Sequence, residues 1–400
     1  MVFTQKQMLL AIGAIVFSPL SSTITMSALH LPISAPEILF LVFLPYLLNN
    51  YKFQSIKRKS TIICLYVWLS LICLAILQME YPLYAILSTA RSYLYLIFFF
   101  LLFSRPNNFD TKSVFYVCCG VLIGWLLEVI ISFKAVILSD VYSVGYGPML
   151  IFPIILGYCA IQKKYFSIAS FTIIILSIGI LGGARRVLLV LVITLILLLI
   201  YFGLKKIKLF AAYLIILLVC GNAIIANQDI IGKSLNEQSP FLYERIFKKT
   251  VNFITGDSNE GDEDRKKMIG WIIERIPASL FPKGFVSKQT ATDPDTGSYN
   301  DVPMLELEYT FGIFGTIFIL VYFGIAATKI FLRIKNGLEN EIDLIFIGGY
   351  IIAIVLLFLE GSFISYPYSV PITGYLFGSI QRISHLKLTI NQINKIDITN

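Results

Sequence analysis

Residues 228–305 are the only long polar interruption in an otherwise apolar chain. The segment includes QDIIGKSLNEQSPFLYERIFKK at 228–249 and GDSNEGDEDRKKMIGW at 256–271, and it ends with DVPML at 301–305. Its ten basic and twelve acidic residues nearly cancel. Within it we expect one helix from Arg265 to Ile276, with Asp264 as its N-cap and Pro277 as its stop, and a second helix near 241–253.

The composition is that of an integral membrane protein. The chain has 400 residues, of which 57% are hydrophobic and 14% charged, and its mean hydropathy is +0.80. A soluble domain would be about half apolar and about one quarter charged. The net charge of +8 predicts no nucleic-acid partner, because the excess lies in short connections between apolar segments, where it orients helices. The cysteine and histidine spacings predict no disulfide framework and no metal site.

Twelve apolar segments approach the length of about 20 residues that crosses a bilayer. If the N-terminus is inside, the inner connections hold eighteen basic residues, whereas the short outer connections hold only Lys134, Arg185 and Arg186. This bias predicts an all-α polytopic membrane protein with about twelve transmembrane helices and both termini inside. Helices 1–9 would occupy residues 1–227, the large outer loop 228–305, and helices 10–12 with a cytoplasmic tail 306–400. The predicted spans are 8–29, 35–50, 61–78, 84–103, 114–133, 147–161, 166–183, 187–203, 208–227, 306–328, 342–359 and 367–381.

Ionisable residues within these spans are candidates for function, because a charge in the hydrocarbon is costly. Under the predicted topology all of them lie in the outer halves or at the outer ends of their helices. Structural alternatives are an Arg91–Glu128 pair between helices and the extension of Arg185 or Arg186 to the headgroups. Glu306 and Glu308 are two residues apart, so we expect at most one of them to face a shared cavity. The candidates are Arg91, Glu128, Arg185, Arg186, Glu306, Glu308 and Glu360.

This one-sided polar layer favours an enzyme at the outer interface over a transporter. A transporter needs polar groups through the depth of the bilayer, or a midplane site between broken helices. Arginine binds phosphate oxygens bidentately and keeps its charge, so it can neutralise a diphosphate leaving group. A carboxylate can take the proton from an attacking sugar hydroxyl. Glycosyl transfer from a polyprenyl diphosphate needs both of these functions.

Three motifs occur in order between about residues 180 and 330. They are Gly182-Gly183-Ala184-Arg185, then Arg265 through Trp271 to Pro282-Lys283-Gly284-Phe285, then Asp301 with Leu305 and Gly312-Ile313-Phe314-Gly315. In this order and topology the chain resembles the O-antigen polymerase (Wzy-type) and O-antigen ligase superfamily of bacterial envelope enzymes, which share many helices and one large periplasmic loop. Ligases carry a histidine at the position of Asp301, so the resemblance favours the polymerases.

The resemblance implies a membrane glycosyltransferase of the bacterial inner membrane, with its large loop and active site facing the periplasm. It would transfer a growing O-antigen- or capsule-type glycan between undecaprenyl-diphosphate-linked oligosaccharides, which are both donor and acceptor. A chain-length regulator is an implied partner besides the lipid bilayer. No metal or other cofactor is expected, because the lipid diphosphate is the activated donor. A ligase, and a flippase or transporter of the same lipid-linked sugars, remain alternatives.

Carried over by position, the resemblance implies that Arg185 and Arg265 bind the lipid diphosphate. Arg91, Arg245 and Arg186 are further candidates for this binding. Asp301 is the first candidate for the catalytic base, and Glu308 and Glu128 are the alternatives to it.

Overall fold

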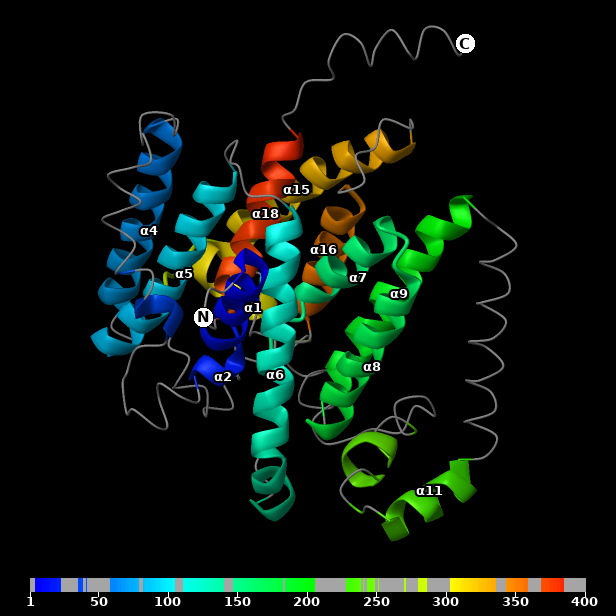
Figure 1. Ribbon diagram of the computed structural model, residues 1–400. Helices are drawn as coiled ribbons and strands as arrows, with labels where there is room; N and C mark the ends of the chain where they lie inside the picture. The colour runs from blue at the N-terminus through cyan, green and yellow to red at the C-terminus, as the bar shows by residue number, and fades with distance from the viewer. Residues whose placement is uncertain are drawn as a thin grey trace, which may run out of the picture.

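The described residues form a bundle of α-helices (Figure 1). The computed structural model describes residues 4–22, 35–38, 41, 58–78, 82–104, 111–139, 147–182, 184–205, 228–238, 240, 243–248, 251, 270, 280–285, 303–335, 343–358 and 368–384. No strand occurs within these ranges. The predicted span 208–227, most of the predicted span 35–50 and most of the predicted loop helix 265–276 lie outside them.

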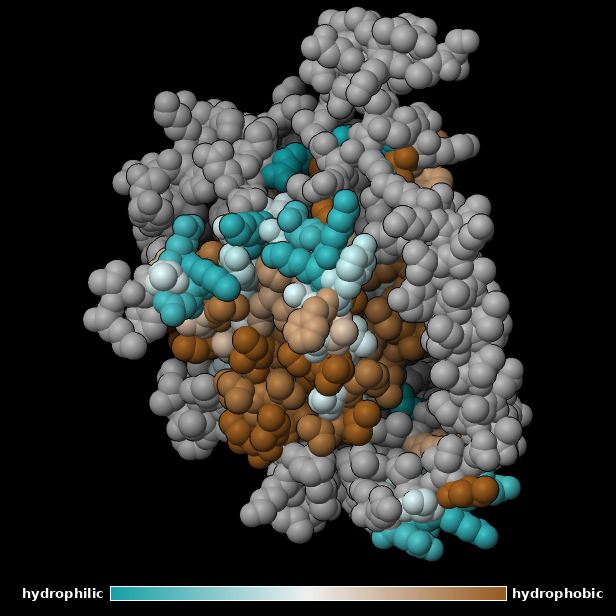
Figure 2. All heavy atoms as spheres, turned by 45° about the vertical axis from the view of Figure 1, so that its right-hand side comes forward, coloured by the Kyte–Doolittle hydropathy of each residue, from teal (hydrophilic) through white to brown (hydrophobic). Residues whose placement is uncertain are grey.

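Three of the described helices are long and apolar enough to cross a membrane, over Ile86–Phe103, Thr111–Ser132 and Pro303–Ile334. Several shorter helices are also apolar. Large apolar side chains lie exposed on the outside of the bundle, such as Tyr66 at 72% and Phe318 at 70%. Figure 2 shows a band of apolar side chains with polar side chains gathered beside it. An exposed apolar surface of this kind fits lipid rather than water, so the architecture is that of a helical membrane protein. The count of twelve spans and the orientation stay predictions.

Most helix bounds agree with the expected spans to within a few residues, but the helices Thr111–Ser139 and Pro303–Lys335 run well beyond the expected ends at 133 and 328. The helices of the first half are α1 (Gln5–Val16), α2 (Pro19–Ser22), α4 (Arg58–Gln78), α5 (Leu83–Phe103), α6 (Thr111–Ser139), α7 (Ile151–Ile161), α8 (Tyr165–Leu181) and α9 (Arg185–Lys205). The second half holds α11 (Gln228–Gln238), η3 (Tyr243–Lys248), α15 (Pro303–Lys335), α16 (Asp343–Leu356) and α18 (Val370–Ser384).

Two of the expected helices are interrupted. The expected span 8–29 starts with α1, bends at Phe17 and Ser18, and resumes as the short α2 from Pro19. Proline has no N–H for the helix and disfavours a helical residue before it, which accounts for the bend. The expected span 306–328 starts earlier, at Pro303, and contains a break at Gly312.

The core lies where α5, α6, α7 and α18 meet their neighbours. In α6, Trp125 is fully buried and stacks on Phe152 of α7, with ring centroids 6.0 Å apart. Helix α1 packs closely on α6, because Gly13 and Gly120 bring the two backbones together without side chains between them. Helix α18 packs on α5 and α15. In Figure 1, α11 and the connection between α8 and α9 lie at one end of the bundle, which we call the loop end, and the C-terminal end of α18 lies at the other.

Candidate functional site

The candidate site is built on the first nine residues of α15, Pro303–Phe311, which we call the half-helix. The side chains of Glu306 and Glu308 on it are both buried, at 1% and 2% exposure. Both are buried because protein surrounds the half-helix. Its Met304 N–H, for example, donates to the Leu357 carbonyl at 3.0 Å. Burial alone does not place the two side chains in one cavity, so the expectation that at most one of them faces a shared cavity stays a prediction.

Gly312 separates the half-helix from the rest of α15. Its backbone angles are φ 69° and ψ 167°, a conformation that is essentially confined to glycine. A Cβ atom at this position would lie 2.7 Å from the Phe281 carbonyl carbon and 2.8 Å from the Leu280 oxygen. Two independent reasons, conformation and space, therefore require glycine here. Broken helices are tolerated at membrane depth where protein buries the free backbone groups.

Glu306 accepts a hydrogen bond from the phenol of Tyr93. The Tyr93 Oη and Glu306 Oε1 atoms are 3.0 Å apart, and both side chains are buried. Tyr93 is the eleventh of the twenty-one residues of α5. The carboxylate of Glu306 therefore lies against the middle of α5. Its position in the outer half of the membrane stays a prediction, like the orientation of the helices.

A short segment of the large loop, 280–285, covers this region, and we call it the strap. Its Lys283 N–H donates to the Tyr309 carbonyl at 3.0 Å, and its Lys283 carbonyl accepts from Gln78 Nε2 at 2.9 Å. The Lys283 ammonium lies 5.0 Å from the centroid of the Tyr309 ring, a cation–π distance. The strap is thus hydrogen-bonded to the half-helix on one side and to the end of α4 on the other.

The end of the strap enters the bundle. Gly284 has φ 98°, and its Cα lies so close to the α4 backbone at Leu71 and Ala75 that no side chain would fit. Phe285 follows and is 1% exposed. Its ring centroid lies 5.2 Å from that of Tyr93, and the Phe311 ring lies 5.8 Å from Tyr93 on another side. The loop, α5 and the half-helix therefore meet at the phenol that binds Glu306.

Arg91, on the same helix α5 as Tyr93, forms an ion pair with Glu37. Arg91 Nε is 3.0 Å from Glu37 Oε1, at an ion-pair distance without the alignment of a hydrogen bond. The Glu37 side chain is 2% exposed and that of Arg91 is 39% exposed. The partner of Arg91 in this pair is therefore Glu37 rather than Glu128, which the sequence had suggested.

The other predicted residues lie on different helices or outside the described ranges. Arg185 and Arg186 are the first two residues of α9, and both are half-buried. The connection before them is tight, since the Ala184 N–H donates to the Gly179 carbonyl at 2.9 Å. Glu128 is half-buried in α6. The residues outside the described ranges are Asp301, Arg265, Trp271 and Glu360.

Arg245 lies in η3, in the large loop, and the structure describes its backbone but not its side chain. The same turn carries an exposed ion pair, with Lys248 Nζ 3.0 Å from Glu244 Oε2. The hydrogen bond from Lys248 to the Glu244 carboxylate raises the pKa of Lys248 above its ordinary value. This pair lies on the surface of the loop, and such pairs contribute little stability.

The structure adds three residues that the sequence reasoning missed, Glu37, Tyr93 and Lys283. Glu37 follows Pro36 at the start of an apolar segment, where an acidic residue is also an ordinary feature of a helix start. Tyr93 is two residues from Arg91, but neutral tyrosine gave no charge signal. Lys283 belongs to the second motif, but no role was predicted for its side chain.

Chemically, the site offers buried carboxylates beside a phenol, under a segment of the polar loop. A carboxylate in this setting can accept a proton from a bound hydroxyl, and half-exposed guanidinium groups can bind phosphate oxygens. No protein-family model matches the chain, and no curated protein matches its sequence.

Proposed function

We propose that the protein polymerises undecaprenyl-diphosphate-linked oligosaccharide repeat units at the outer face of the bacterial inner membrane. The growing glycan would leave its lipid diphosphate and join the sugar terminus of the next lipid-linked repeat. The bond between the glycan and the diphosphate breaks, a glycosidic bond forms, and the acceptor hydroxyl loses a proton. The lipid diphosphate is the leaving group.

The contact between the strap and the half-helix carries this proposal. It brings a polar loop of the size expected for an outer active site directly onto the segment that holds Glu306 and Glu308. A transporter has less use for such a loop, whereas an enzyme needs a cover that excludes water from its reacting groups. Glycan transfer in the presence of water requires that exclusion, because water competes with the acceptor hydroxyl.

Within the proposal, Glu308 is the described candidate for the base. In this proposal Glu306, which accepts the Tyr93 hydroxyl, holds the half-helix in place. Asp301, two residues before Pro303, is a base candidate on the resemblance alone. Removing a general base typically costs about 10²–10⁴-fold in rate, enough to abolish long polymers.

The arginines serve the diphosphate in this proposal. Arg91 is held by Glu37 and keeps a partly open side chain. Arg185 and Arg186 add charge at the N-terminus of α9, where the helix dipole also favours an anion. Arg265 is included on the resemblance to the motif in the loop.

Transport of the same lipid-linked sugars is the second candidate function, and one observation favours it. Broken helices with carboxylates near the middle of the bundle are typical of transporter binding sites, and α15 combines a break at Gly312 with Glu306 against the middle of α5. A ligase has only the family resemblance in its support.

The test is electrophoresis of envelope polysaccharide from a strain that lacks the protein. The strain is complemented with wild type, Glu308→Gln, Arg185→Ala, or the control Glu244→Gln in the exposed loop pair. A polymerase predicts single repeats in the deletion strain, and a ladder restored by wild type and Glu244→Gln but not by the other two variants. An intact ladder in the deletion strain would refute the polymerase.

The same strain separates the alternatives. Accumulated lipid-linked polymer that is not attached to its acceptor would indicate a ligase. Lipid-linked repeats that accumulate on the inner leaflet, protected from an enzyme added outside, would indicate a transporter.

A further inference from the structure

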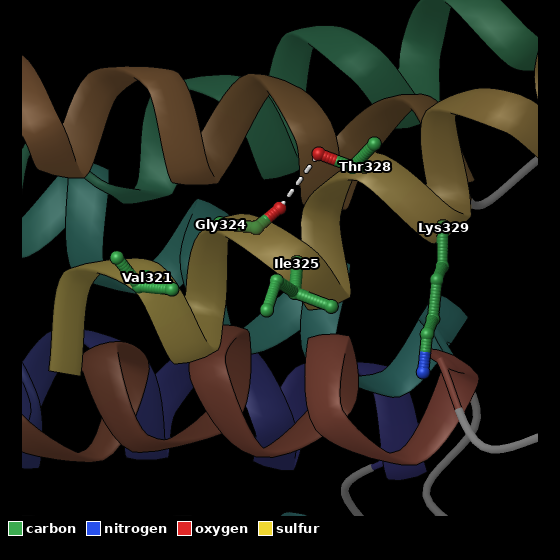
Figure 3. Close-up of a pocket in the computed structure, with 5 residues that line it drawn as sticks. All are labelled: Val321, Gly324, Ile325, Thr328 and Lys329. Carbon is green, nitrogen blue, oxygen red and sulfur yellow. Dashed lines mark hydrogen bonds between the residues drawn. The ribbon is translucent and has the colours of Figure 1, made fainter. Parts of the chain in front are cut away.

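An open groove runs along α15 beyond the half-helix. It has a volume of about 370 Å³, and the described residues that line it lie on one face of the helix. Since α15 rises about 1.5 Å per residue, the lined stretch is about 12 Å long. The lining residues are Val321, Gly324, Ile325, Thr328 and Lys329 (Figure 3).

Gly324 of the groove lining lies beside Tyr350 of α16. A Cβ atom at Gly324 would lie 3.2 Å from the Tyr350 hydroxyl of α16, which donates to the Leu320 carbonyl. The Thr328 hydroxyl donates to the Gly324 carbonyl at 2.8 Å, so the helix itself satisfies this polar group. What remains for a ligand is mostly apolar surface.

The apolar part of the groove faces outward. Val321 is 51% exposed and Ile325 is 54% exposed, on the same helix as the exposed Phe318. These side chains belong to the surface that fits a bilayer. An occupant of the apolar part therefore comes from the lipid phase, not from water.

One end of the groove is cationic. The exposed Lys329 closes the row of lining residues in Figure 3. One turn further along α15, Arg333 Nη1 donates to the Ile383 carbonyl of α18 at 3.3 Å, and Arg382 lies in the last turn of α18. Among the described residues that line the groove, Lys329 is the cationic one.

We propose that this groove binds one acyl chain of an anionic phospholipid, with the lipid phosphate at Lys329. An apolar groove that ends at a cation is complementary to a hydrocarbon chain that ends at an anion, and basic pockets between membrane helices bind such headgroups. The site lies toward the end of the bundle opposite the loop end. It does not depend on the proposed polymerase reaction.

Native mass spectrometry of the purified full-length protein tests the site. The protein is offered equal amounts of phosphatidylglycerol and phosphatidylcholine with identical acyl chains, and the ratio of the first lipid adducts is measured. Wild type should prefer phosphatidylglycerol. Lys329→Met keeps the apolar stem and removes the charge, and it should lower the preference about fivefold.

Lys164→Met is the matched control, because Lys164 is an exposed lysine at the start of α8 and lines no part of the groove. It should keep the wild-type preference. Val321→Trp fills the groove without a charge change, and it should reduce the adducts of both lipids while keeping their ratio. The side chains of Lys329, Lys164 and Val321 are all exposed, so the three variants should fold.

Three results would overturn the proposal. The first is that Lys329→Met keeps the wild-type preference for phosphatidylglycerol. The second is that Lys164→Met loses as much of this preference as Lys329→Met does, which would indicate a diffuse charge effect. The third is undiminished lipid binding in Val321→Trp, which would place the acyl chain elsewhere.

Discussion

Gly312→Ala should release the strap from the half-helix. The alanine would have to adopt φ 69° and ψ 167°, and its Cβ would stand within 2.8 Å of backbone atoms of Leu280, Phe281 and Pro282. Backbone atoms cannot move aside as the tip of a flexible side chain can. The strap must therefore shift away or the break must change shape.

The size of the effect follows from these two costs. Holding a residue other than glycine in this conformation costs about 1–3 kcal/mol, and forcing one extra carbon into a packed site costs about 1–3 kcal/mol. Together they weaken the docking of the strap by about 2 kcal/mol or more. Since about 1.4 kcal/mol is a factor of ten, the open state should be populated at least about thirtyfold more.

Trypsin cleavage after Lys283 measures this opening. In the docked state the Lys283 N–H and carbonyl are both hydrogen-bonded, to Tyr309 and Gln78, so cleavage requires the strap to open. When opening is fast, the cleavage rate follows the population of the open state. New N-termini at Gly284 are counted by mass spectrometry over time, in detergent, for wild type and Gly312→Ala.

The control is Gly348→Ala in α16, where a Cβ would meet only the Pro153 Cβ at 3.4 Å, an ordinary contact. This change should leave the cleavage rate unaltered and favour its helix slightly. Equal cleavage rates in wild type and Gly312→Ala would refute the reasoning. They would mean that the strap is not held by the close approach at Gly312.

Three further substitutions test the polar contacts of Glu306 and Glu37. Tyr93→Phe removes the hydrogen-bond donor to Glu306 and should cost about 1.5–3 kcal/mol of folding stability. The cost should appear as a lower midpoint of thermal unfolding in detergent. The control is Tyr84→Phe at an exposed position, and an equal midpoint for both variants would contradict the role of the hydrogen bond. Arg91→Met removes the cation beside the buried Glu37 and should lower the midpoint of thermal unfolding. Glu37→Gln should cost less, because Arg91 is 39% exposed and can turn to solvent; the reverse order of unfolding midpoints would show that the pair does not hold Glu37.

The long apolar helices could be predicted from the sequence because their signal is local. The expected span 84–103 became α5 at Leu83–Phe103, and the expected span 166–183 became α8 at Tyr165–Leu181. A run of apolar residues of that length has few alternatives to a helix in a membrane. The break before Pro19 also follows from a local rule, because proline interrupts a helix, although the expected span 8–29 was continuous there.

The candidate site was less predictable. The sequence placed Arg91, Glu306 and Glu308 among the candidates from their charge alone, and all three lie around α5 or on the half-helix. It proposed the wrong partner for Arg91, since Glu37 comes from a segment more than fifty residues away. Pairing at such a separation depends on which helices pack together, and residue spacing does not contain that information.

The sequence by itself determined that the chain is apolar, helical and interrupted by one large polar loop, because hydropathy and helix length are properties of short segments. Only the tertiary structure decided which groups the carboxylates contact and what covers them. Gly312 combines a positive φ with close contact to the strap, which is held by Gln78, by Tyr309 and by the close approach of Gly284 to α4. These contacts join segments far apart in the chain, so their free energy appears only when the helices are packed.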